Sequence, residues 1–255
     1  MRGPDEDRGI YNSRFSSVVI RGNTISTDSS PNFSCTGIQF NCGLKNAATI
    51  SNNILSNLAY GVYVWGGTGL SADGITCASR ATGVVVKNND FSGIWQDGIG
   101  VVGDLAFGNS FVYNTLDLPG FWNSRAIYSE GYDNRYTNNI IKGYCQTAVC
   151  LSGWDDTANS GLFAYPHNEL FKANSISGLT SQLAHYTLDM YAHDNTVIGL
   201  ETENATYTDF GTNNFFKYVY PYILPAAATT GIAASKAGIP DKAKETGPKR
   251  GALPL

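Results

Sequence analysis

The sequence has little charge and no sign of helices. Only 15% of its residues are Asp, Glu, Lys or Arg, and its repeated segments lack the 3.6-residue apolar period of an amphipathic helix. No apolar run approaches the 18 or so residues of a membrane-spanning helix, so no membrane span is expected. A charged-then-apolar leader is also missing at the start, so export cannot be inferred from this chain.

Several motifs that carry chemistry are missing too. The paired CxxC and HxxxH spacings of common zinc sites do not occur, so no metal site is predicted. A phosphate-binding glycine loop and a G-x-S-x-G elbow are absent. The formal net charge of the chain is −4. Five basic and two acidic residues lie from Ala226 onward, so that part carries +3 and the rest of the chain carries −7. This acidic body argues against a nucleic-acid partner.

The five cysteines cannot all form disulfides with one another. Cys35 with Cys42, and Cys145 with Cys150, are spaced to close short loops in an oxidising compartment. Cys150 alternates with Val149 and Leu151 in a strand-like segment, and the favoured interpretation is that it is a core residue.

The chain does contain a repeated phrase, a short apolar strand followed by Asn, one further residue and another apolar residue. Copies occur at Asn23, Asn53, Asn89, Asn114, Asn139, Asn174 and Asn195, with a weak copy at Asn213 and Asn214. A second phrase, a small residue before a short apolar pair, begins at Gly9, Gly37, Gly61, Gly98, Ala126 and Ala148. Irregular repeats of short strands without helices predict a solenoid, in which each coil buries its apolar face against the next. Asn fits the corners because it tolerates left-handed backbone and can hydrogen-bond from coil to coil.

We therefore predict an all-β fold with coils over 1–216 and an irregular C-terminal extension over 217–255, an aromatic segment followed by an Ala/Gly/Pro/Lys-rich tail. The phrases resemble the repeats of the right-handed parallel β-helix, the pectate-lyase-like superfamily, over about residues 9–216. Long excursions at 66–81 and 154–172 are expected to shape one face of the solenoid.

Stacking brings distant residues together, because equivalent positions of successive coils lie about 4.8 Å apart. Acidic and aromatic residues recur just after the second phrase, at Trp65, Asp104, Glu130, Trp154, Asp155 and Asp156. Carboxylates on neighbouring or next-but-one coils would lie roughly 5 or 10 Å apart, close to the separations in retaining and inverting glycosidases. Crowding of two carboxyl groups would raise the pKa of one of them, so that a protonated acid would lie beside an ionised base. A tryptophan beside them would stack on a sugar ring. Acidic residues at solenoid turns are equally well explained as solubilising groups.

A second group of charged residues lies around the segment SRAIYSEGYDNR. Polysaccharide lyases of the superfamily use Arg or Lys as a base, often with Ca²⁺, which would make Arg125 the base and Asp97 and Asp104 the Ca²⁺ ligands. Asp97 and Asp133 are also candidate substrate-binding residues, together with the two tryptophans. The same segment faintly resembles one coil of the inulin fructotransferases, and that resemblance would make Glu130 the acid/base residue.

The leading hypothesis is an extracellular, cell-surface or virion-associated module that binds and cleaves a polysaccharide, as a hydrolase or a lyase, and needs no cofactor unless a lyase binds Ca²⁺. The alternative is a non-catalytic spike, fibre or adhesin subunit. An N-terminal end without an evident capping element and a divergent tail would then join it to other chains as a homo-oligomer or larger assembly.

Overall fold

The computed structural model describes residues 8–13, 17–27, 35–41, 48–70, 76–119, 124–156, 162–176, 179–181 and 183–222. These residues form strands, turns and bends, with no helix among them. Within the same residues, therefore, no helix is long and apolar enough to cross a membrane. The all-β expectation is confirmed.

Three long sheets, which we name A, B and C, make up the body. Sheet A contains β1 (Arg8–Ser13), β4 (Thr36–Asn41), β7 (Tyr60–Trp65), β13 (Asp97–Val102), β17 (Arg125–Ser129), β20 (Thr147–Leu151), β25 (Tyr186–Leu188), β27 (Thr206–Asp209) and β29 (Tyr220–Pro221). Sheet B contains β2 (Val18–Arg21), β5 (Ala48–Ser51), β11 (Val85–Lys87), β15 (Ser110–Val112), β18 (Arg135–Thr137), β23 (Leu170–Lys172), β26 (Thr196–Ile198) and β28 (Phe215–Lys217). Sheet C contains β3 (Thr24–Ser26), β6 (Ile54–Ser56), β12 (Asp90–Ser92), β16 (Thr115–Pro119), β19 (Ile140–Cys145) and β24 (Leu179–Ser181).

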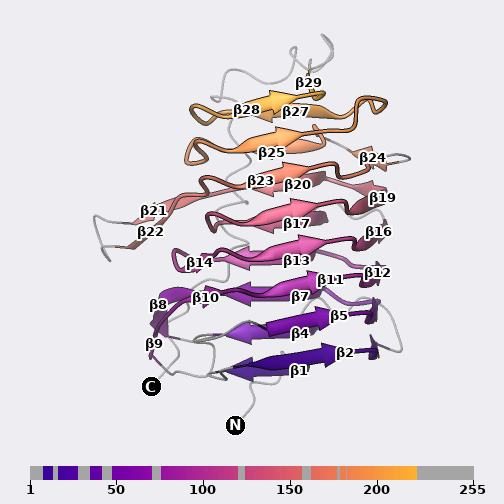
Figure 1. The fold of residues 1–255 in the computed structure, drawn as a ribbon, viewed down its shortest axis with the longest axis vertical. Coiled ribbons are helices and arrows are strands. Elements are labelled where there is room, and N and C mark those ends of the chain that lie inside the picture. Colours follow the sequence, from indigo (N-terminus) through magenta and orange to yellow (C-terminus); the bar gives the residue numbers. More distant parts are fainter. Residues whose placement is uncertain are drawn as a thin grey trace, which may run out of the picture.

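The chain visits these sheets in a repeating order. From β13 in sheet A it passes to β15 in sheet B, to β16 in sheet C and back to β17 in sheet A, which pairs in parallel with β13. The result is a stack of rungs (Figure 1), consistent with a parallel β-solenoid. Strand pairing continues to Pro221, beyond the predicted end of the coils at 216, and the residues from 223 onward lie outside the described part of the chain.

Two antiparallel hairpins and one short parallel pair stand outside the three sheets. The hairpins are β8 (Gly67–Leu70) with β9 (Thr76–Ser79), and β21 (Trp154–Asp156) with β22 (Leu162–Ala164). Both fall in the two segments expected to be excursions, and both extend from the same side of the stack (Figure 1). The parallel pair joins β10 (Ala81–Thr82) to β14 (Ala106–Phe107).

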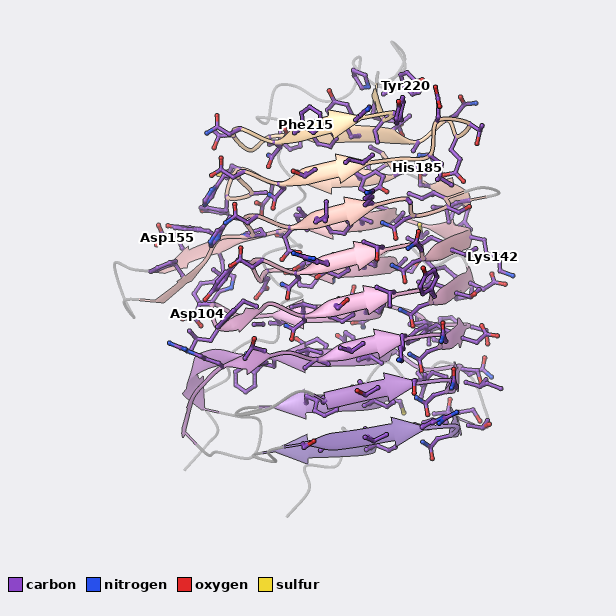
Figure 2. The ribbon with its side chains drawn as sticks, in the orientation of Figure 1. Asp104, Lys142, Asp155, His185, Phe215 and Tyr220 are labelled. Atoms are coloured by element: carbon purple, nitrogen blue, oxygen red, sulfur yellow. The ribbon has the colours of Figure 1, made fainter. Side chains whose placement is uncertain are left out.

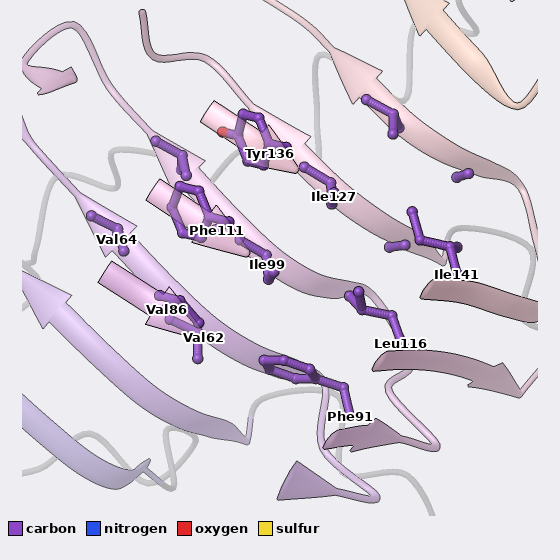
Figure 3. Close-up of a cluster of buried hydrophobic side chains, with 14 of the residues drawn as sticks. Val62, Val64, Val86, Phe91, Ile99, Phe111, Leu116, Ile127, Tyr136 and Ile141 are labelled. Atoms are coloured by element: carbon purple, nitrogen blue, oxygen red, sulfur yellow. The ribbon is translucent and has the colours of Figure 1, made fainter. Parts of the chain in front are cut away.

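Apolar side chains of all three sheets meet inside the stack. The register aligns Phe91 with Leu116, and Phe111 with Tyr136, on successive rungs, and the rings of the second pair stack at 4.8 Å. Burial of each such side chain contributes roughly 2 kcal/mol. Figure 3 shows this core with Val62, Val64, Val86, Phe91, Ile99, Phe111, Leu116, Ile127, Tyr136 and Ile141, all fully buried.

The second phrase begins with a small residue for a steric reason. A Cβ placed on Gly98 would lie 2.5 Å from Leu116 Cδ2 and 2.8 Å from the carbonyl oxygen of Ala126. A Cβ on Gly61 would lie 2.5 Å from Phe91 Cδ1. The strand of sheet A begins where the chain passes close to the side chains of sheet C, so only a small residue fits.

The repeated asparagines form a hydrogen-bonded ladder at the corner between sheets B and C. Asn114 Oδ1 accepts from the backbone N and the Nδ2 of Asn89, both at 3.0 Å. Asn114 Nδ2 donates at 3.0 Å to Asn139 Oδ1 and at 3.0 Å to the carbonyl of Val86. The same pattern links Asn23, Asn53, Asn89, Asn114, Asn139 and Asn174.

Asn195 and Asn214, taken from the sequence as further copies of this series, belong instead to a second ladder. That ladder lies at the corner before sheet B and runs through Asn109, Asn134, Glu169, Asn195 and Asn214. The assignment of the last two copies was therefore wrong. Both corners place Asn after a short turn, so the local sequences at the two corners are similar.

Candidate functional site

The sequence-predicted residues that come together lie on or beside sheet A, on the side away from the core. In β13 the side chains of Ile99 and Val101 point inward and are fully buried in the core. Alternation of side chains therefore turns Gly100 and its register partner Tyr128 outward. We name the group Asp97, Arg125, Tyr128, Glu130 and Trp154 the sheet A cluster.

Arg125 and Asp97 form a two-point ion pair between β17 and β13. Arg125 Nε donates to Asp97 Oδ1 at 2.6 Å, and Nη2 donates to Oδ2 at 3.0 Å. The two side chains are 13% and 3% exposed. The register places the two residues directly opposite each other, so pairing in parallel strands fixes this contact.

The guanidinium of Arg125 also touches aromatic and thiol groups. Its central carbon lies 3.9 Å from the centre of the Tyr128 ring. Burial alone lowers the pKa of Arg125, but the charge of Asp97 outweighs this and raises it above its ordinary value. Arg125 therefore holds its proton more firmly than an ordinary arginine does.

Glu130 follows β17 and accepts three hydrogen bonds. Tyr128 Oη donates to Oε1 at 2.7 Å, whereas the backbone N of Gly103 and Trp154 Nε1 donate to Oε2 at 3.1 and 3.2 Å. Glu130 is 4% exposed. Burial raises its pKa above the ordinary value of a glutamate, although these three donors oppose the rise. A carboxyl group held in one orientation with a raised pKa is suited to act as an acid.

Asp104 and Trp65 lie next to Glu130 along the stack. Asp104 directly follows Gly103, whose backbone N donates to Glu130, and is partly exposed. Trp65 pairs with Val102 on the neighbouring rung and is also partly exposed. The expectation that these residues share a region of neighbouring coils therefore agrees with the register.

Asp97 is engaged by Arg125 and is not a free carboxylate beside Glu130. Asp97 lies opposite Arg125, and Glu130 follows Arg125 by five residues along the same strand direction. Both carboxylate oxygens of Asp97 accept hydrogen bonds from Arg125, at 2.6 and 3.0 Å. Asp97 holds Arg125 in place instead.

The remaining predicted acids lie outside the sheet A cluster. Asp155 is exposed on the β21–β22 hairpin and accepts a hydrogen bond from Tyr165 Oη at 2.6 Å. Figure 2 shows Asp104 and Asp155 on the same side of the stack, opposite Lys142. Asp133 is exposed at the corner before sheet B with a φ of 55°. The side chain of Asp156 lies outside the description.

The cysteines differ from their sequence interpretation. Cys145 and Cys150 are both free thiols, so the proposed short loop between them does not form. Cys150 pairs with Tyr128 and shares its outward face, whereas Val149 and Leu151 are buried in the core. Its interpretation as a core residue was wrong, because alternation turns it away from its two neighbours. Cys35 is buried, and Cys42 lies outside the described residues.

Sequence reasoning missed two polar residues. Tyr128 was not singled out from the sequence, although its position between Arg125 and Glu130 on one strand was a usable signal. Asp189, 4% exposed, accepts from the backbone N of Gly153 at 2.7 Å and so holds the start of the β21–β22 hairpin. Within the described residues, no group of three or more His, Cys, Asp or Glu side chains could hold a metal ion.

Comparison with known proteins found no family model that matches the chain, and no curated protein or solved structure that matches it significantly.

Proposed function

We propose that the chain is a right-handed parallel β-helix of the pectate-lyase-like type that binds a polysaccharide beside sheet A and hydrolyses it. The repeating path through sheets A, B and C and the asparagine ladders support the fold. The proposal places the protein outside the cell, at a cell surface or on a virion, where such polymers occur.

The environment of Glu130 carries the functional proposal. Its carboxyl group is fixed by Tyr128, Gly103 and Trp154, and burial raises its pKa. Protonated Glu130 donates its proton to the glycosidic oxygen as the bond to the sugar carbon breaks. Asp104, on the turn that meets Glu130, acts on the sugar carbon either directly as nucleophile or through a water molecule.

The other members of the site position the substrate. Trp65 and Trp154 offer flat apolar surfaces for sugar rings, and the ion pair of Arg125 with Asp97 keeps the strands of sheet A in register. Hydrolysis is favoured over a lyase reaction because Arg125 is held protonated by Asp97. A Ca²⁺ ion on Asp97 would have to displace Arg125.

The test is incubation of the protein with a panel of neutral and acidic polysaccharides, followed by assay of new reducing ends and of unsaturated-uronate absorbance. We expect reducing ends without that absorbance. Glu130→Gln and Asp104→Asn should each lower the rate by at least about 100-fold. Asp117→Asn, an exposed acid on β16 paired with Lys142, is the matched control and should not change it. Absorbance from unsaturated uronate would establish a lyase instead, and no product from any glycan would refute catalysis.

One observation favours a structural role as the second candidate. The last described rung exposes Phe215 and Tyr220 by 54% and 53%, on β28 and β29, which are the end strands of sheets B and A among the described residues. Figure 2 places both at the end of the stack. Strand edges with exposed aromatic residues recruit further chains. Rings, filaments or trimers seen by microscopy and sedimentation, together with no cleavage, would support a spike or fibre subunit.

A further inference from the structure

The outward face of sheet B carries only positive charge. The core row of this sheet includes Val86, Phe111 and Tyr136, which are fully buried, so the residues on either side of them point outward. The register aligns one outward row as Arg21, Ser51, Lys87, Val112, Thr137, Lys172, Ile198 and Lys217. The other row is Val19, Thr49, Val85, Ser110, Arg135, Leu170, Thr196 and Phe215.

Five of these residues are exposed cations, namely Arg21, Lys87, Arg135, Lys172 and Lys217. None of the eight strands of sheet B contains Asp or Glu. The ion pairs found among the described residues use Arg125, Lys142 and His193, and none of these five. An ordinary solvated face would mix both signs of charge. A face of one sign is unusual in a chain with a formal net charge of −4.

The cations also follow a line. Four of them share one row, on the first, third, sixth and eighth strands of the sheet. At about 4.8 Å per strand, successive cations of the row lie roughly 10, 14 and 10 Å apart. The whole row is about 34 Å long and runs parallel to the stacking axis. Arg135 lies in the adjacent row, within the longest gap.

We infer that the outward face of sheet B binds a linear acidic polysaccharide, lengthwise, with about one carboxylate or sulfate per disaccharide. Two of the three spacings in the row, about 10 Å each, are close to the length of a disaccharide unit, and Arg135 lies within the longer gap. Successive anions of such a polymer can therefore meet the cations of this face. The partly exposed Thr137 and Ser110 offer hydroxyl groups to the sugars, whereas Ser51 is buried.

The same spacing argues against nucleic acid. A nucleic-acid strand carries a phosphate about every 3.4 Å, far more densely than these cations. Binding of single strands also relies on aromatic side chains on which bases stack. In the described rows Phe215 is the one aromatic residue that points outward. A sparse row of cations on a flat sheet therefore fits a sparsely charged polymer.

This inference goes beyond the proposed function, because the face is separate from the sheet A cluster and binding needs no reaction at Glu130. A polysaccharide held along sheet B would keep the protein on an acidic matrix or capsule whether or not sheet A cleaves it. Binding is measured without turnover, so the two proposals can fail separately.

The experiment measures binding of hyaluronan, which carries one carboxylate per disaccharide, to the whole chain at rising salt concentrations. The test variant is Lys87→Thr with Lys172→Thr, which copies Thr137 of the same row. We expect a loss of roughly two- to fivefold per cation removed and a decrease of about two in the slope of log affinity against log salt. Lys142→Thr, on sheet C, is the control and should bind like the unaltered chain. If the double variant folds poorly, the single variants Lys87→Thr and Lys172→Thr test the same expected loss of affinity per cation removed.

Neutral dextran, an oligothymidylate and vesicles containing phosphatidylserine are the comparison ligands. Weaker binding of all three than of hyaluronan, with the loss confined to the sheet B variants, supports the inference. Absent hyaluronan binding, equal binding by the double variant, or tighter binding of the oligothymidylate or the vesicles would overturn it.

Discussion

Arg125 and Asp97 lie directly opposite each other on adjacent parallel strands, and their side chains close a two-point ion pair with contacts of 2.6 and 3.0 Å. The carboxylate of Asp97 is almost fully buried, so its charge depends on Arg125 for compensation. Removing one partner of a buried pair leaves the other charge unpaired, which costs far more than the pair itself contributes.

We therefore expect Arg125→Gln to lower the free energy of unfolding by about 3–5 kcal/mol in urea titrations. The double variant with Asp97→Asn should recover part of that loss, because no unpaired charge remains. Lys142→Gln, which breaks the exposed pair with Asp117, is the control and should cost less than about 1 kcal/mol. A single Arg125 variant as stable as the unaltered chain would show that Asp97 has another source of compensation.

Asn138 and Asn139 are neighbours with different roles, and their variants should separate them. Asn139 is fully buried in the ladder, accepting from Asn114 and donating to the carbonyl of Phe111. Asn138 is exposed with a φ of 55°. Asn139→Ala should lower the free energy of unfolding by roughly 2–4 kcal/mol, because buried donors lose their acceptor. Asn138→Gly should change it by less than about 1 kcal/mol, since glycine accepts that backbone. Equal effects in thermal unfolding would contradict the ladder.

This pair also shows how far the sequence could be interpreted. It correctly predicted that stacked asparagines bond from coil to coil, but it assigned left-handed backbone to the ladder residue itself. In the described structure the positive φ belongs to the preceding residue, as at Asn52 and Asn88 before Asn53 and Asn89. The recurring asparagines show where the coils repeat. Which of two adjacent asparagines joins the ladder and which adopts the positive φ depends on which side chain faces the core.

The candidate site was harder to predict for the same reason. Trp65, Asp104 and Glu130 were grouped correctly because stacking depends only on the repeat. The partner of each side chain depends on register within a rung, and the sequence does not state it. Arg125 was therefore taken as a base although it faces Asp97, and the hydrogen bonds of Tyr128 and Gly103 to Glu130 were not foreseen.

The close approach at Gly98 leads to a third prediction. A Cβ there would come within 2.5 Å of Leu116 Cδ2, so a branched side chain must displace the core. Gly98→Val should cost about 1–3 kcal/mol in urea unfolding. Thr115→Val, at a partly exposed strand position of sheet C, introduces the same β-branched residue without adding volume and should change stability by less than about 1 kcal/mol. A neutral Gly98→Val would mean that sheets A and C are spaced more loosely than the structure indicates.

Glu169 provides a pH-dependent prediction, because it occupies an asparagine position of the second ladder. It is fully buried, and its Oε1 accepts from Asn134 Nδ2 at 2.8 Å and from Ser129 Oγ at 3.1 Å. Oε2 and the hydroxyl of Tyr136 have no hydrogen-bond partner within the described structure. Burial raises the pKa of Glu169 to about 8, and the charge of Asp133 adds to the rise.

The folded chain therefore holds a proton on Glu169 that the unfolded chain releases near the ordinary pKa of 4.5. Its contribution to stability is complete below that value and is lost as the pH rises toward 8, at roughly 1 kcal/mol per pH unit. Glu169→Gln keeps a neutral amide in the same place and should remove this slope, so that its unfolding free energy exceeds that of the unaltered chain increasingly from pH 5 to 8. Asp133→Asn should leave most of the slope, because burial is the larger cause. Parallel stability curves for the unaltered chain and Glu169→Gln across this range would show that Glu169 is ionised in the folded protein, with a cation or water completing its ladder position.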